Sequence, residues 1–123
     1  MSDSGRAHID PRLLALIDKA EEEEYLFIDD LQEGDVVEID TLNHTYRMKV
    51  LDPKGHKVEA TSNGRHITEP TVTWANGSSL TGWGTMIKLG AIAVGYRFKL
   101  GYLLFSLTKR VRVNGVKVLP KPE

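Results

Sequence analysis

Cysteine is absent from this chain of 123 residues, and so is any long apolar segment. Without thiols there can be no disulfide framework, no cysteine zinc site and no thiol catalysis. The longest apolar run, residues 89–94, is far shorter than the roughly 20 residues that a membrane-spanning helix needs. The first 11 residues are polar and lack an apolar signal segment. We therefore expect a cytoplasmic protein that is neither exported nor inserted in a membrane.

The composition is that of an ordinary globular chain, with 41% hydrophobic and 27% charged residues. Its length suits one domain, because folded domains cluster at about 100 to 150 residues. We expect a flexible start over residues 1–9, a single domain over 10–119 and a short tail over 120–123. Within the domain, a helix should cover about 11–25 and a β body about 34–119.

Charge is distributed unevenly along the chain. Residues 1–40 carry 13 acidic and 3 basic side chains, whereas residues 41–123 carry 4 acidic and 13 basic ones. One interpretation is that an acidic N-terminal element packs on a basic β body. The other is that the acidic segment screens or regulates a basic binding surface. The sequence leaves both open.

A helix is predicted to start at Asp10-Pro11, since aspartate caps helix N-termini and proline is favoured at the first helical position. Apolar residues then recur at helical spacing and predict one buried stripe. They are Leu13, Leu14, Ile17 and Ala20. Four consecutive glutamates at positions 21–24 lie near the expected C-terminal end, where the helix dipole disfavours negative charge.

Three turn signals between residues 42 and 65 predict an antiparallel meander of four strands. A two-residue turn at Asn43-His44 would place apolar pairs on one face and opposite charges on the other. The expected pairs are Val37 with Val50, Ile39 with Met48, Thr41 with Tyr46, Glu38 with Lys49 and Asp40 with Arg47. These pairs define the expected register of the first hairpin.

The second turn is predicted to be a three-residue loop, Pro53 to Gly55, with the glycine in the left-handed conformation. The expected pairs are Val50 with Val58, Met48 with Ala60 and Lys49 with Glu59. A third turn at Asn63-Gly64 would put Ile67 opposite Ala60. Ile67 and Glu69 share the inward parity, whereas Val72 and Trp74 have the opposite one, so we expect a bend or bulge near Pro70.

The second half of the chain continues in short apolar strands. We expect a flexible connector over residues 76–84, a buried strand over 86–94 broken by Gly90, two further strands, and a last turn at Asn114-Gly115. Seven or eight strands with glycines at the bends predict a mainly β fold. It is either a small antiparallel barrel or a two-sheet sandwich, with one N-terminal amphipathic helix.

Several short motifs resemble a group of short bacterial small-β-barrel proteins that have no assigned activity. They are Thr41-Leu42-Asn43 followed by Tyr46, Glu69-Pro70-Thr71, Gly77-Ser78, and Ile87-Lys88-Leu89-Gly90 followed by Ile92. The segment Asp35-Val36-Val37 after Gly34 also resembles SH3-like barrels. These motifs are turn and bend signals, so the resemblance implies a fold and no function.

Histidines and one glutamate suggest a possible metal site. Alternate turns of a meander lie at the same end of the sheet, so His44 and His66 could approach each other there. With Glu69 they would make three ligands, the minimum for catalytic zinc. The alternative is that these are exposed turn residues. Glu69 is likewise either an inward carboxylate able to act as an acid or base, or a residue that turns to solvent.

Basic residues alternate with core residues near the C-terminus and suggest a site for an anion or nucleic acid. They are Arg97, Lys99, Lys109, Arg110, Arg112 and Lys117. The Asn114-Gly115 turn should place Arg112 directly beside Lys117, and like charges paired across strands cost stability. Tyr96, Tyr102 or Trp83 could add a stacking surface for single-stranded nucleic acid.

No motif in the sequence requires an enzyme or a cofactor. The glycine-rich stretch over residues 77–84 lacks the Gly-Lys-Ser/Thr ending of a P-loop, and no serine lies in a nucleophile-elbow sequence. We expect a non-enzymatic β-barrel interaction module whose partner the sequence does not identify; a protein and a second copy of the chain are both compatible with it. Nucleic-acid or polyanion binding and a metal-assisted or acid/base enzyme remain as alternatives.

Overall fold

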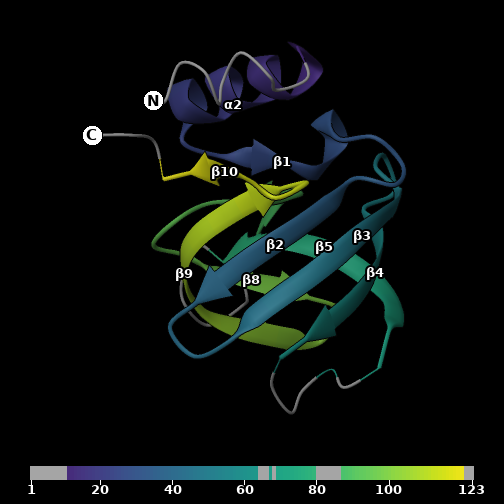
Figure 1. Cartoon of the computed structure of the whole chain (residues 1–123). Helices are drawn as coiled ribbons and strands as arrows, with labels where there is room; N and C mark the ends of the chain where they lie inside the picture. The colour runs from purple at the N-terminus through teal and green to yellow at the C-terminus, as the bar shows by residue number, and fades with distance from the viewer. Residues whose placement is uncertain (1–10, 64–66, 68, 80–86, 121–123) are drawn as a thin grey trace.

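The computed structural model describes residues 11–63, 67, 69–79 and 87–120 and shows a mainly β protein (Figure 1). Within these residues, six antiparallel strands close into a barrel, and a helix near the start lies across one end of it. The expected fold class is confirmed, and the barrel rather than the sandwich is the form that the chain adopts.

Two long strands close the barrel. The barrel strands in chain order are β2 (Val36–Thr41), β3 (Thr45–Asp52), β4 (Lys57–Ser62), β5 (Thr71–Ser79), β8 (Arg97–Leu100) and β9 (Leu103–Val113). Strand β5 pairs with β4 and then with β8, and β9 pairs with β8 and then with β2. Short strands outside this ring are β1 (Leu26–Phe27), β6 (Ile87–Leu89), β7 (Ala91–Ile92) and β10 (Val116–Leu119).

The first hairpin, β2–β3, has the expected faces but not the expected register. Val37 lies opposite Met48, and Ile39 lies opposite Tyr46. The predicted pairs with Val50 and Met48, respectively, are therefore wrong by two residues. The same shift applies to the charged pairs, because Glu38 faces Arg47. A slip of two residues keeps every side chain on its own face, which is why alternation alone did not detect it.

The turn of this hairpin explains the shift. Thr41 N–H donates to His44 C=O at 2.8 Å, so the two residues between them, 42 and 43, form the turn. The Thr41 hydroxyl oxygen also accepts a hydrogen bond from His44 N–H at 3.1 Å. Threonine therefore closes the turn with its side chain as well as its backbone, one residue earlier than the predicted turn at 43–44.

The second hairpin, β3–β4, has the predicted register. The observed pairs include Met48 with Ala60, Lys49 with Glu59 and Val50 with Val58. The left-handed residue is His56, with φ of 57°, and not Gly55. Gly55 N–H donates to the Asp52 carboxylate at 3.2 Å, and a Cβ at Gly55 would lie 2.6 Å from that exposed carboxylate and displace it.

The third hairpin keeps the meander but not the predicted pairing. Ala60 lies opposite Thr71, and not opposite Ile67, whose carbonyl accepts a hydrogen bond from Ser62 N–H at 3.0 Å. The predicted turn residue Gly64 lies outside the described residues. The connector expected over 76–84 is wrong in its first part, because β5 continues to Ser79.

Strand β5 continues because its polar residues are hydrogen-bonded inside the fold. The Ser78 hydroxyl donates to Ala91 C=O at 2.9 Å and accepts from Ala93 N–H at 3.2 Å. A buried serine with both functions satisfied is compatible with a strand. The expected break at Gly90 is confirmed, since this residue has φ of 69° and separates β6 from β7.

Helix α2 (Pro11–Glu23) packs on β10 and β1 at the end of the barrel (Figure 1). The predicted cap Asp10 lies outside the described residues. The buried stripe consists of Leu13, Leu16, Ile17 and Ala20, so Leu16 takes the place predicted for Leu14, which is half-buried. Burial of these side chains, at roughly 25 cal/mol per Å² of apolar area, is what fixes the helix on the barrel.

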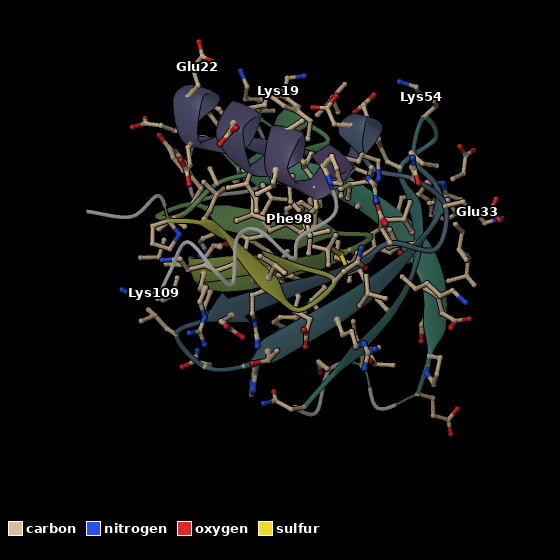
Figure 2. All side chains as sticks on the ribbon, turned by 45° about the horizontal axis from the view of Figure 1, so that its top comes forward. Lys19, Glu22, Glu33, Lys54, Phe98 and Lys109 are labelled. Carbon is tan, nitrogen blue, oxygen red and sulfur yellow. The ribbon has the colours of Figure 1, made fainter. Side chains whose placement is uncertain are left out.

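Three aromatic rings lie together in the barrel core. Tyr46 stacks on Phe105 with the ring centroids 3.6 Å apart, and Phe98 packs at 5.7 Å from Phe105. They come from β3, β9 and β8, and Phe98 lies deep beneath the surface (Figure 2). The interior is therefore packed, and burial raises the pKa of the Tyr46 hydroxyl.

Candidate functional site

The basic residues of β9 meet acidic residues of β2 on the outside of the barrel. Arg110 Nε lies 2.7 Å from Asp40 Oδ2, and an Arg112 Nη lies 2.8 Å from Asp40 Oδ1. The same guanidinium is 4.0 Å from Glu38. Two of the six predicted anion-binding residues are therefore engaged with carboxylates of the chain itself.

The Asp40 carboxylate is held in its charged form by this arrangement. Its partial burial raises the pKa, but hydrogen bonds from Arg110 and the Thr45 hydroxyl, together with the positive charge of Arg112, outweigh that effect. The pKa of Asp40 is consequently lowered below the ordinary value of aspartate. At neutral pH this carboxylate is ionised and neutralises part of the basic strand.

The other predicted basic residues are spread over three strands. Arg97 of β8 donates from Nε to Phe105 C=O at 2.7 Å, and Lys99 lies two residues further along. Lys109 is the extra residue at the irregularity between β2 and β9, and it is exposed. Lys117 lies opposite Arg112, as predicted.

The proposed metal ligands are only partly within the described residues. His44 follows the first turn, where its ring meets Tyr46 edge-on with centroids 6.1 Å apart. Glu69 is exposed, at a bend before β5. His66 lies outside the described residues. Across the residues that the structure does place, no three histidine, aspartate or glutamate side chains come together as a metal-binding group.

A histidine–aspartate pair that the sequence analysis did not predict lies where three segments meet. His56 Nε2 is 2.7 Å from Asp29 Oδ1. Asp29 belongs to the short helix η1 (Ile28–Asp30), and both side chains lie against Gly90. Asp29 and His56 are 27 residues apart, so no local spacing indicated the pair. The arrangement orients an imidazole, but among the described residues we identify no nucleophile beside it.

An exposed apolar and aromatic surface lies on β5. Val72 and Trp74 point outward, and 55% of the Trp74 surface is exposed. Tyr102, in the turn between β8 and β9, is fully exposed. It follows Gly101, whose N–H donates to Trp74 C=O at 2.8 Å, so the two aromatic residues lie at neighbouring places on the barrel. We call Val72, Trp74 and Tyr102 the Trp74 face.

The Trp74 face contrasts with the rest of the barrel exterior. Although β9 also exposes Leu107, many outward residues of the other barrel strands are charged: Glu38 and Asp40, Arg47 and Lys49, Lys57 and Glu59, Arg97 and Lys99, and Arg110 and Arg112. The chain does bend at Glu69, but this bend does not bring Val72 and Trp74 into the core. Instead, Trp74 lies opposite Lys57, and Val72 lies opposite Glu59.

The predicted stacking residues differ in their surroundings. Tyr96 is partly exposed and lies just before β8, away from the fully exposed Tyr102 after that strand. Trp83 lies outside the described residues. Trp74 was not among the predicted binding residues, although its outward parity within β5 was the signal that could have identified it.

None of the helices in the described part of the chain has the length and apolar character needed to cross a membrane. Searches of protein-family models, curated proteins and solved structures find no match to this chain.

Proposed function

We propose that this chain is a non-enzymatic interaction module that docks a protein partner on the Trp74 face. The observation that carries this proposal is that β5 exposes Val72 and Trp74 beside the fully exposed Tyr102, whereas the outward residues of its neighbour β4 are mostly charged. Tryptophan and tyrosine contribute most of the binding energy at many protein interfaces. The absence of cysteine supports placing the module in the cytoplasm.

The charges around the Trp74 face favour a protein over a nucleic acid. Lys57 and Glu59 flank the face with opposite signs, which suits the polar rim of a protein interface. A nucleic acid would need a cationic surface, and Arg110 and Arg112 are already paired with Asp40. Base stacking on Trp74 or Tyr102 remains the second candidate, because aromatic side chains accept bases of any sequence.

The test compares the variants Trp74→Ala and Tyr102→Ala with the control Leu42→Ala. Leu42 lies in the β2–β3 turn and is 59% exposed, which is similar to Trp74. The parent chain and the Trp74→Ala variant are each used to capture proteins from a cell extract. Proteins that only the parent captures are identified, purified and titrated against each chain. We expect Trp74→Ala to weaken binding at least about tenfold and Leu42→Ala to leave it unchanged. Stability should change by less than about 1 kcal/mol, since the replaced side chains are exposed.

Two results would overturn the proposal. One is that every captured protein binds the parent and Trp74→Ala equally, or that none is captured. The other is that oligothymidine binds the parent with a steep salt dependence and loses affinity in Trp74→Ala, which would identify the face as a nucleic-acid site. Sedimentation of the parent and Trp74→Ala shows whether the partner is a second copy of the chain.

A further inference from the structure

A pocket of about 320 Å³ opens at the C-terminal end of α2, on a different part of the molecule from the Trp74 face. Its wall contains two carboxylates, Glu21 and Glu24, and two aromatic rings, Tyr25 and Tyr96. Buried Leu119 of β10 is among its apolar lining residues. Ligand pockets begin at about 300 Å³, so this one suits a group the size of one long side chain.

The carboxylates of the pocket have no counterion within the described residues. Neither Glu21 nor Glu24 forms an ion pair or hydrogen bond through its side chain to another described residue. The last turn of α2 contains no basic residue, and the helix dipole there is also negative. A cation in the pocket would relieve both of these unfavourable interactions.

The Tyr25 ring already contacts a cation of the chain itself, which leaves Tyr96 as the ring of the pocket wall that can take another. The ammonium of Lys88 lies 4.8 Å from the centre of the Tyr25 ring, within the distance of a cation–π contact. Lys88 is not a residue of the pocket wall. The chain itself therefore uses this ring to hold an ammonium group, while the pocket beside it offers carboxylates, the Tyr96 ring and an apolar lining together.

We propose that this pocket binds the protonated end of an organic amine or guanidine carried on an apolar stem. The carboxylates neutralise the charge, and the tyrosine rings and apolar wall cover the stem. An anion is disfavoured by the two carboxylates, and a neutral apolar molecule would leave them without a counterion. The amine is either a free diamine or the lysine or arginine side chain of a peptide, and both carry the same chemistry.

The experiment titrates the full chain with 1,5-diaminopentane and with 1,5-pentanediol, which has the same stem without charge. We expect binding of the diamine, with an affinity that falls as salt is added, and no binding of the diol. A blocked lysine peptide and its norleucine counterpart form the second arm. Tighter binding of the lysine peptide than of the diamine identifies a protein side chain as the source, and the reverse identifies a free amine.

Variants test whether this pocket is the binding site. The double variant of Glu21→Gln and Glu24→Gln should weaken diamine binding about tenfold, since each exposed ion pair contributes modestly. Tyr96→Leu should weaken it about threefold to tenfold through loss of a cation–π contact. The matched control is Glu22→Gln, because Glu22 lies on the same turn but points away from the barrel (Figure 2) and does not line the pocket.

A third variant separates binding from folding. Glu24 has φ of 65°, a conformation that glycine adopts without strain, so Glu24→Gly should raise the melting temperature while it lowers diamine affinity. If Glu24 had only a structural role, the more stable Glu24→Gly variant would bind the diamine as tightly as the parent. The proposal is overturned if the diol binds as well as the diamine, if no diamine binding is detected, or if Glu22→Gln weakens it as much as the double variant.

Discussion

At the scale of single residues, the Asp35 side chain joins three parts of the chain that are distant in sequence. Its carboxylate accepts hydrogen bonds from the Arg12 guanidinium at 2.8 Å, Gln32 N–H at 2.9 Å and the Asn114 amide at 3.1 Å. Burial raises its pKa, but these three donors outweigh burial and lower the pKa below the ordinary value. One carboxylate thus ties α2 to the turn between β9 and β10.

We expect Asp35→Asn to lower the free energy of unfolding by about 1.5 to 3 kcal/mol at pH 7, the range measured for hydrogen bonds to charged groups. A depressed pKa contributes stability that is fully present above the unfolded value near 4 and is lost as pH falls through the lower folded value. The difference between parent and variant should therefore shrink below about pH 4.

Urea unfolding at several pH values measures this difference, with Glu33→Gln as the control at an exposed carboxylate nearby. A gap between the parent and Asp35→Asn that stays constant down to pH 2 would contradict the assignment of Asp35 as the ionised centre of this cluster.

At the scale of elements, the backbone of Gly90, between β6 and β7, connects to both β5 and η1 through hydrogen bonds. It has φ of 69°, its N–H donates to Asn76 C=O, and its carbonyl accepts from Ile28 N–H. A Cβ at this position would lie 2.8 Å from both the Asp29 carboxylate and the His56 ring. The break between β6 and β7 therefore makes room for the histidine–aspartate pair.

We expect Gly90→Ala to destabilise the fold by about 2 kcal/mol or more, because left-handed strain adds to the displacement of a hydrogen-bonded pair. The control is Gly95→Ala, where φ is 88° but a Cβ would meet nothing within 4 Å. That variant should cost only the backbone strain, about 1 to 2 kcal/mol. Equal losses in urea unfolding would show that the contact with His56 and Asp29 is not energetically important.

Elements with local turn signals were the most predictable from the sequence. The β3–β4 register and the pairing of Arg112 with Lys117 follow from Pro53 and from Asn114-Gly115, whose backbone preferences act over a few residues. The β2–β3 register was not predictable, because Thr41 closes the turn through its side chain and a slip of two residues leaves the alternation unchanged.

At the scale of the whole molecule, acidic residues from the first part of the chain pair with basic residues from the second part across neighbouring strands. The acidic residues that pair with Arg110 and Arg112 belong to β2 and not to α2. The basic residues of the helix, in turn, pair with aspartates that follow it, since Arg12 meets Asp35 and Lys19 meets Asp30. The ion pairs between β2 and β9 therefore join the acidic and basic halves of the chain, whereas the pairs of α2 lie within the acidic half.

We therefore expect glutamine at positions 21–24 to leave the affinity for single-stranded DNA unchanged at low salt. Asp40→Asn should raise that affinity, because it frees the Arg110 and Arg112 guanidinium groups. The salt dependence should steepen by about 0.7 in log–log slope for each new phosphate contact on a single strand. Fluorescence anisotropy with labelled oligothymidine measures both variants. A larger gain from the glutamine variant would show that the helix screens the basic strands.

The sequence by itself determined which residues face inward on most strands, where α2 runs and that the fold is a β barrel or sandwich. These properties depend on periodicity and turn residues, which act locally. Only the tertiary structure decided that β9 closes the ring on β2, that His56 meets Asp29, and that Glu24 and Tyr96 share a pocket. Each of these joins residues far apart in the chain, and their proximity follows from barrel closure and not from any pattern within one segment.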